Sequence, residues 1–310
     1  MKKNNIFTLL LSLLLIVSGI WYLGIILRPT DTDDVRIQID SFHSLPENSL
    51  DVIVYGSSHS YRGFDTRVLN DEYNISAYNY SWNWLKMNTT KAFIKDSLIS
   101  QKPKVVLIES YYAYENLHDC DINAEIYFSR YLKNKTAVMD FINECFGDNF
   151  RKKLSFYVPL YAFHDNWVDI SLKSLLPAKT NNSAVTNRGF CDIQMIDEIS
   201  IVDQNSCEQK TFDDYAIKNL DEIVSICNEN DIDIIFYTTP FEWAYEYADA
   251  MEEYAKNNNC LYINSFKYLD EIGIDEKTDF SDPAHLNTYG AQKLARFIGK
   301  YISENYIFNK

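Results

Sequence analysis

The stretch that decides the fold runs from Asp51 to Gly63 and reads DVIVYGSSHSYRG. Its apolar run, Val52 to Tyr55, is β-branched and aromatic and too short for a buried helix, so it predicts an interior strand of a parallel sheet. Gly56 allows a sharp turn, and the residues after it can open a helix whose free N–H groups would stabilise an oxyanion. An α/β sheet carries its chemistry at this edge. An ordinary serine-rich turn explains this stretch equally well when it is taken alone.

A second stretch, Asp279 to Lys300, reads DFSDPAHLNTYGAQKLARFIGK. A turn between Asp282 and His285 can bring the carboxylate to one imidazole nitrogen and leave the other to take a proton from serine. Beside a carboxylate, the pKa of His285 is expected near 6.5 or somewhat higher. Asn287 or Thr288 is expected to cap a terminal helix. An isolated D-x-x-H is more often a surface turn, and it gains weight only together with the serine turn.

Together these stretches resemble the SGNH (GDSL-like) hydrolase superfamily, with a nucleophilic Ser in a G-D-S turn after the first strand and a D-x-x-H pair near the C-terminus. The corresponding segments here are Gly56-Ser57-Ser58 and Asp282-Pro283-Ala284-His285. The resemblance is greatest to the membrane-anchored, extracytoplasmic branch of Gram-positive envelopes, which includes the D-alanyl transfer proteins of teichoic acid modification. It implies Ser58 as nucleophile, His285 as base and Asp282 as the orienting carboxylate.

The resemblance also implies an oxyanion hole, whose usual sequence signals are altered here. Ser81 stands at the position of a family Gly, and the sequence contains no G-x-N-D motif. The implied donors are therefore the N–H groups of Ser58 and Ser81 and a side chain from Asn79 or Asn83. Ser57 and Ser60 are the alternative nucleophiles.

A Ser-His-Asp triad transfers an acyl group through a covalent serine ester. Water as acceptor would give an esterase, and a sugar hydroxyl would give an O-acyltransferase. The resemblance implies acyl esters of an envelope polysaccharide as substrate and allows a membrane-bound O-acyltransferase as partner. The alternative, favoured by the missing G-x-N-D, is a catalytically inactive SGNH-like scaffold that binds envelope glycans or assembly partners.

The N-terminal segment from Ile6 to Leu27 is 22 residues long and carries no charge. At about 1.5 Å per residue it spans the roughly 30 Å hydrocarbon core of a bilayer. Lys2 and Lys3 precede it and predict a cytoplasmic N-terminus, so the remainder is expected outside the cell. Its length, and the lack of an A-x-A-like site, favour an uncleaved anchor over a signal peptide. We therefore expect an anchor at 1–28, a polar linker with little periodicity at 29–50, and an SGNH-hydrolase-like domain at 51–310.

Composition excludes several classes of function. The formal net charge of −15, without a basic stripe, argues against nucleic acid as a partner. With only 9 glycines and no phosphate-cradling loop, no dinucleotide cofactor is expected. The six cysteines lack C-x-x-C spacing, which disfavours zinc. An outward location permits a disulfide between Cys191 and Cys207, whereas Cys227 and Cys260 are expected to be packed thiols. The 23 tyrosines and 5 tryptophans suit sugar rings, although biased codon usage explains them better.

The rest of the domain alternates helices and strands, which predicts an α/β fold with a mainly parallel sheet between helical layers, flavodoxin-like in its three layers. The expected elements after the first strand are a helix at 88–100, a strand at 105–108, a helix at 212–230, a strand at 232–238, a helix at 242–256 and a strand at 260–263. An insertion at about 114–209 interrupts them, with helix-like pieces at 124–146 and 150–175. It either flanks the site or is a peripheral decoration, and His164 and Trp167 within it fit packing better than catalysis.

Overall fold

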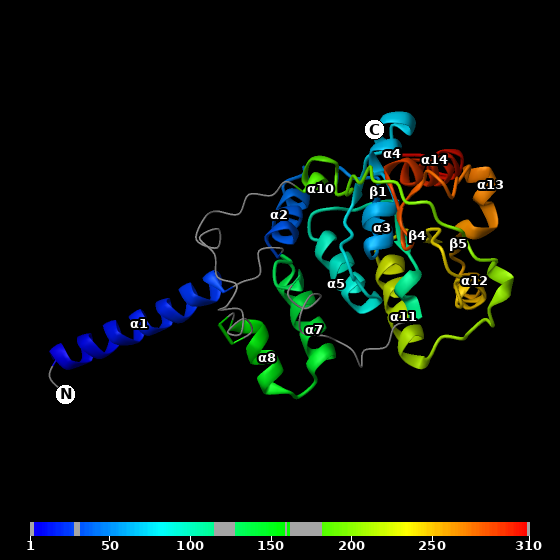
Figure 1. The fold of residues 1–310 in the computed structure, drawn as a ribbon. Helices are drawn as coiled ribbons and strands as arrows, with labels where there is room; N and C mark the ends of the chain where they lie inside the picture. Colours follow the sequence, from blue (N-terminus) through cyan, green and yellow to red (C-terminus); the bar gives the residue numbers. More distant parts are fainter. Residues whose placement is uncertain (1–2, 28–31, 115–127, 159, 162–181, 309–310) are drawn as a thin grey trace.

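The computed structural model describes residues 3–27, 32–114, 128–158, 160–161 and 182–308 (Figure 1). Its centre is a parallel sheet of five strands in the order β2-β1-β3-β4-β5. This is the order of flavodoxin-like doubly wound folds. The strands are β1 (Val52–Tyr55), β2 (Ala77–Asn79), β3 (Val105–Glu109), β4 (Asp233–Thr238) and β5 (Leu261–Asn264). The predicted α/β class with a parallel sheet is confirmed.

Alternate residues of each strand enter two hydrophobic cores on opposite faces of the sheet. Ile53 and Tyr55 point into one core, whereas Val52 and Val54 point into the other. The first core is covered by α5 (Met87–Ser97), α11 (Asp214–Glu229) and α12 (Ala248–Asn257). The second is covered by α4 (Thr66–Tyr73), α13 (Leu269–Ile272) and α14 (Thr288–Asn305). Burial on both faces explains why the strands read as continuous apolar runs.

Most predicted elements of the sheet are found within a few residues of their expected ends. The exception is α12, which begins at Ala248 rather than at Glu242. The segment before it is an aromatic loop in which Phe241 and Tyr245 are buried and pack with Phe266 of η6 (Ser265–Tyr268). The sequence also gave no strand for β2, because three residues are too few for a period of two to be recognised.

The predicted linker at 29–50 is wrong. Helix α2 (Thr32–His43) occupies much of it, and Val35, Ile39 and Phe42 are buried in the first core. Gln38 on the same helix donates through Nε2 to the carbonyl oxygens of Asn79 and Ser81, at 3.2 and 3.1 Å. The spacing of the three apolar residues is helical, so the signal was present but was obscured by the acidic residues around it. The chain entering the domain is therefore packed against it and does not act as a spacer.

The predicted insertion includes α7 (Lys135–Phe146), α8 (Phe150–Tyr157) and α10 (Ser183–Thr186). Helices are thus confirmed for parts of both predicted pieces, whereas His164, Trp167 and Cys120 lie outside the described residues. Cys191 and Cys207 are both free thiols, so the proposed disulfide between them is wrong. Cys227 is buried, as expected, and Cys260 is half-buried.

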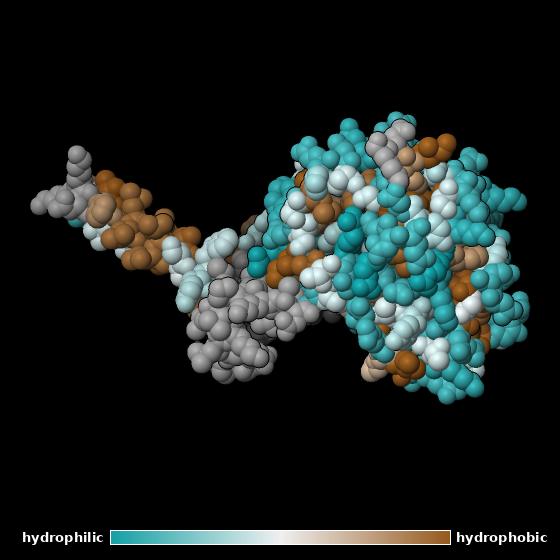
Figure 2. All heavy atoms as spheres, turned by 90° about the horizontal axis from the view of Figure 1, so that it is seen from above, coloured by the Kyte–Doolittle hydropathy of each residue, from teal (hydrophilic) through white to brown (hydrophobic). Residues whose placement is uncertain are grey.

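Helix α1 (Lys3–Ile26) contains the predicted apolar segment. Asn5 to Gly24 has a mean hydropathy of 2.3, and by length and composition it could cross a membrane or belong to a signal sequence. Figure 2 shows this helix as an apolar rod that projects from a largely hydrophilic body. Exposed apolar side chains along a whole helix are costly in water, which fits a helix that contacts lipid.

Candidate active site

The turn after β1 delivers a serine to the carboxyl edge of the sheet. Gly56 has φ of 152°, and a Cβ there would lie 2.6 Å from Cβ of Glu109, so both conformation and space require glycine. The six-residue helix α3 (Ser58–Gly63) follows at once. Ser57 caps it, with Oγ accepting a hydrogen bond from the N–H of His59 at 3.2 Å. Ser58 is therefore the first residue of a helix that starts at a strand end.

The predicted Ser58, His285 and Asp282 side chains are brought into a hydrogen-bonded chain. Nε2 of His285 lies 2.8 Å from Oγ of Ser58, and Nδ1 lies 2.7 Å from Oδ1 of Asp282. The two halves come from opposite ends of the domain, with His285 and Asp282 on a short antiparallel hairpin of β6 (Phe280–Asp282) and β7 (His285–Leu286). This is the order of contacts in which a histidine takes a proton from serine while a carboxylate fixes its tautomer.

The hairpin is held in place from two sides. Asn287 caps α14 by accepting from the N–H groups of Tyr289 and Gly290, as predicted, and its own amide donates to the carbonyl oxygen of Thr278 at 2.7 Å. On the other side, the N–H of Glu242 donates to the carbonyl oxygen of Pro283 at 2.9 Å. A residue that is both helix cap and loop anchor fixes the position of His285 relative to α14.

Burial governs the charge of the two histidines beside Ser58. The pKa of His285 is lowered from its ordinary value by desolvation and by the nearby Arg62, although Asp282 acts in the opposite direction. The expected value near 6.5 or higher is therefore corrected, because burial outweighs the carboxylate. His59 is buried against Tyr111, with ring centroids 4.1 Å apart, and desolvation holds its pKa well below the ordinary value. At neutral pH both rings are uncharged, and His285 is free to accept a proton.

The candidate oxyanion donors differ in how they are used. The amide of Asn79 donates to the carbonyl oxygens of Ser60 and Phe64, at 2.9 and 3.0 Å, and so it fastens α3 rather than pointing a donor at substrate. The hydroxyl of Ser81 donates to Oγ of Ser60 at 2.9 Å. The backbone N–H groups of Ser58 and Ser81 make no hydrogen bond to another described residue.

Asn83 is the remaining side-chain candidate. Its Oδ1 is buried without a hydrogen-bond partner among the described residues. An amide oxygen only accepts hydrogen bonds, so a donor to an oxyanion would have to be Nδ2 of Asn83, which makes no hydrogen bond to another described residue. The arrangement therefore favours the two N–H groups and Asn83 over Asn79.

Two residues near Ser58 were not identified from the sequence. Arg62 places Nη1 3.5 Å from Oδ2 of Asp282. Glu109 is buried behind the turn, where its carboxyl accepts from Oγ of Ser57 at 3.1 Å and from the N–H of Tyr111 at 2.8 Å. Desolvation raises the pKa of Glu109 to about 8. An acidic residue that closes an apolar strand, as in VVLIE, was the signal that could have found it.

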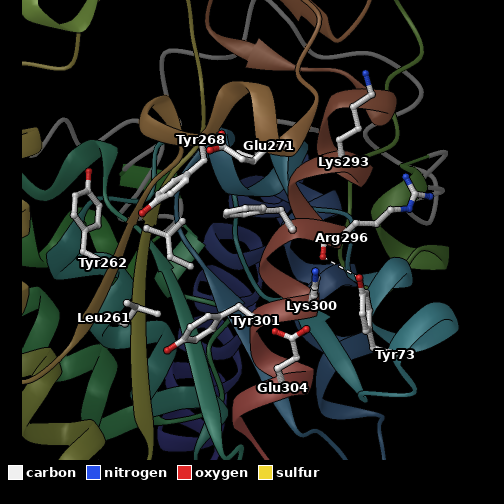
Figure 3. Close-up of a pocket in the computed structure, with 13 residues that line it drawn as sticks. Tyr73, Leu261, Tyr262, Tyr268, Glu271, Lys293, Arg296, Lys300, Tyr301 and Glu304 are labelled. Atoms are coloured by element: carbon white, nitrogen blue, oxygen red, sulfur yellow. Dashed lines mark hydrogen bonds between the residues drawn. The ribbon is translucent and has the colours of Figure 1, made fainter.

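Among the described residues, no group of three or more His, Cys, Asp and Glu side chains is arranged to hold a metal ion. A hollow of ≈ 670 Å³ lies between β5, α13 and α14, and none of the three hydrogen-bonded side chains lines it (Figure 3). Tyr268, Tyr301 and Arg296 border it, and Tyr73 donates to the carbonyl oxygen of Arg296 at 2.9 Å. A second hollow, ≈ 520 Å³, is lined by Tyr111, whose ring stacks on His59.

Comparison with known proteins gives matches only among solved structures. No protein-family model matches the chain, and no curated protein does. One similar structure is a candidate acylhydrolase from Bacteroides fragilis, with 12% identity, a TM-score of 0.42, and coverage of 86% of this chain and 93% of that one. Another is a GDSL-like lipase from Bacteroides thetaiotaomicron, with 12% identity, a TM-score of 0.42, and coverage of 89% and 100%.

Proposed function

We propose that this protein is an SGNH-type serine esterase or O-acyltransferase, anchored in the membrane by α1, that acts outside the cytoplasm on acyl esters of an envelope polysaccharide. One observation carries the proposal. Oγ of Ser58, the imidazole of His285 and the carboxylate of Asp282 are hydrogen-bonded in series at the carboxyl edge of a parallel sheet, 2.8 and 2.7 Å apart. Open α/β sheets bind and transform ligands at this edge.

The geometry supports a two-step acyl transfer. Oγ of Ser58 forms a bond to the acyl carbon while its proton passes to Nε2 of His285, and Asp282 stabilises the resulting imidazolium. The bond from the acyl carbon to the leaving oxygen then breaks, and His285 returns the proton to that oxygen. Negative charge on the carbonyl oxygen is met by the N–H groups of Ser58 and Ser81, and removal of one such donor typically costs about 2.7–4 kcal/mol.

The second step decides between the two activities. His285 removes a proton from the acceptor, whose oxygen bonds to the acyl carbon. The bond from that carbon to Oγ of Ser58 then breaks, and His285 returns the proton to Oγ. Water as acceptor completes ester hydrolysis, whereas a sugar hydroxyl completes transfer. A membrane-bound O-acyltransferase that hands over acyl groups is the partner that this second reaction would need.

A second candidate function, the catalytically inactive glycan-binding scaffold, is favoured by one observation. The sequence lacks G-x-N-D, and the amide of Asn79 is occupied within α3. That leaves the oxyanion hole to two backbone N–H groups and Asn83.

Labelling by a fluorophosphonate ester separates the two functions. The full chain in detergent is expected to be labelled, and Ser58→Ala is expected to abolish labelling, because only a serine activated by a base attacks such a reagent at a useful rate. Ser57→Ala, which removes a neighbouring hydroxyl, serves as the control for the site of attack. A folded wild-type chain that stays unlabelled while it binds glycans would establish the scaffold instead.

Protease accessibility tests the proposed topology. Protease added to intact cells from which the wall has been removed is expected to digest the body and spare α1, since the lysines lie on the cytoplasmic side. Full protection of the chain, or release of a soluble form without residues 6–27, would reject the anchored, outward arrangement.

A further inference from the structure

The hollow that Tyr111 lines is walled largely by aromatic side chains. We call it the aromatic groove and define it by its aromatic lining residues, Tyr111, Tyr114, Trp243, Tyr245 and Tyr247. Its volume is ≈ 520 Å³, and its rim carries Ser206, Lys210 and Glu246. Lys210 pairs with Glu246 at 2.5 Å, and its Nζ lies 5.9 Å from the ring centre of Tyr247. The lining of the groove thus combines aromatic rings with polar side chains.

The aromatic groove is connected to the hydrogen-bonded serine through a layer of packed rings. Tyr111 stacks on His59, whose ring centre lies 5.1 Å from that of His285. Trp243 packs on Phe241 at 4.9 Å, and Phe241 lies 5.4 Å from His59. The loop that carries Trp243 also bonds to the hairpin of Asp282 and His285 through Glu242. The buried rings of His59 and Phe241 lie between the groove and Ser58, so the groove suits a part of the substrate beyond the ester that Ser58 attacks.

Two tryptophans remain exposed at this edge of the sheet. Trp243, after β4, is 37% exposed, and Trp84, after β2, is 59% exposed. Trp84 also has φ of 64°, a conformation that costs a non-glycine residue roughly 1–2 kcal/mol. Its ring lies 6.3 Å from Tyr112, which in turn lies 4.9 Å from Tyr111. Exposure and strain at such a position suit a ligand surface better than a structural role.

The chemistry of the walls favours sugar rings over a fatty acyl chain. An acyl chain in the aromatic groove would strip water from Lys210, Glu246 and Ser206 without replacing their hydrogen bonds, which is unfavourable. A pyranose ring presents its C–H face to an aromatic ring and its hydroxyls to the rim, so it satisfies both kinds of wall.

We propose that the aromatic groove binds sugar units of the substrate polymer, and that Trp84 contacts further units on the other side of Ser58. The ester that is attacked would then lie within a sugar chain rather than on a small molecule. This inference rests on the proposed function, because it takes Ser58 as the group that reacts.

The test compares the hydrolysis of two kinds of ester, a sugar ester and a small ester, by the full chain in detergent. The substrates are O-acetylated pentasaccharides of glucose and of N-acetylglucosamine, and p-nitrophenyl acetate. In Trp243→Ala and in Trp84→Ala, the ratio of kcat/KM for the pentasaccharide to that for p-nitrophenyl acetate is expected to fall at least about tenfold, the equivalent of one aromatic contact. Trp243→Phe is expected to restore most of the loss. Tyr268→Ala, in the larger hollow of Figure 3, is the matched control and should leave both rates unchanged.

Two outcomes would overturn the inference. One is an unchanged ratio in both tryptophan variants. The other is a Trp243→Ala effect that grows from p-nitrophenyl acetate to p-nitrophenyl octanoate and is absent with the pentasaccharides, which would make the groove an acyl pocket.

Failure of the proposed function gives a different result. If the wild type hydrolyses neither ester, binding of unmodified pentasaccharides to Ser58→Ala is measured by calorimetry. A Kd that rises about tenfold with Trp243→Ala would support the groove without catalysis, and no binding at millimolar concentration would reject both.

Discussion

The domain contains a second cluster of a serine, a histidine and an aspartate, and the two clusters differ in instructive ways. In the inner cluster, which we define as His43, Asp96 and Ser100, Nε2 of His43 lies 2.7 Å from Oδ2 of Asp96, and Nδ1 lies 3.2 Å from Oγ of Ser100. These distances resemble those among Ser58, His285 and Asp282. By distances alone, either could be taken for a catalytic triad.

Their positions in the fold are opposite. Ser58 follows β1 at the carboxyl edge of the sheet, whereas Ser100 precedes β3 and so lies at the amino edge. The N–H of Ser58 has no partner among the described residues, but that of Ser100 donates to the carbonyl oxygen of Ser97 at 3.1 Å. Ser100 therefore lacks the free donor that an oxyanion needs.

Their carboxylates are also used differently. Asp96 is fully buried and accepts from the hydroxyl of Tyr80 at 2.8 Å and from the N–H of Asn134 at 2.7 Å, besides His43. It joins α2, α5 and the start of α7, which is a structural task. Three side chains within hydrogen-bonding distance therefore do not by themselves make a catalytic site, and only Ser58 combines them with a free backbone N–H and a place at the carboxyl edge of the sheet.

The largest expected difference between the clusters lies in their serines. Ser58→Ala should lower kcat on a small acyl ester by about 10⁶-fold, as loss of a serine nucleophile does in other serine hydrolases. Ser100→Ala should leave kcat within about twofold, because among the described residues its hydroxyl bonds to His43 alone. Steady-state rates with p-nitrophenyl acetate measure both. An active Ser58→Ala variant would remove the triad from the mechanism.

The aspartates should separate activity from stability. Asp282→Asn should reduce turnover by up to about 10⁴-fold with little change in Tm, because asparagine supports the wrong tautomer of His285. Added to Ser58→Ala it should cost almost nothing more, since the residues act as a unit. Asp96→Asn should instead keep the turnover number and lower the free energy of unfolding by about 1–3 kcal/mol, because a buried network loses an acceptor. Thermal melts and steady-state rates on the same samples measure both effects. Loss of turnover in Asp96→Asn and loss of stability in Asp282→Asn would exchange the roles of the two clusters.

The pH profile tests the electrostatics around His285. The base must be neutral to accept a proton, so activity rises as His285 deprotonates, and its lowered pKa places that rise below pH 6.5. Arg62 contributes to the lowering, so Arg62→Gln should move the acid limb of kcat/KM to higher pH. Rates from pH 4.5 to 8 measure the shift. An acid limb above 6.5 in the wild type would mean that the carboxylate outweighs burial.

The smallest expected effect concerns Glu109, the buried carboxyl behind Ser57. Its pKa is raised from 4.5 to about 8, so the unfolded chain loses this proton first and stability falls as pH rises between these values. Glu109→Gln keeps an acceptor for Ser57 and Tyr111 but cannot ionise, so it should flatten the decline of Tm between pH 5 and 8. Asp282→Asn, at a half-buried carboxylate, serves as the comparison. An equal slope in wild type and Glu109→Gln would place the ionisation elsewhere.

The sequence alone was enough to predict those elements whose signal lies in a short stretch of chain. Four of the five sheet strands, the long helices and the apolar α1 follow from local runs and periods, which depend on short stretches of chain. The sequence also singled out Ser58, Asp282 and His285, whose side chains the structure joins by hydrogen bonds, because each lies in a compact turn with a recognisable order of residues.

The contacts between residues far apart in the sequence became known only from the folded structure. It showed that α2 packs into the core and that the amide of Asn79 donates to carbonyl oxygens of α3 and its C-cap. It also placed Glu109 behind Ser57 and Arg62 beside Asp282. None of these contacts follows from local spacing. It also reversed the expected direction of the pKa of His285, because desolvation depends on what covers a side chain and not on its neighbours in sequence. The aromatic groove is the same kind of result, since its rings come from segments more than a hundred residues apart, between Tyr111 and Trp243, that meet only when the sheet forms.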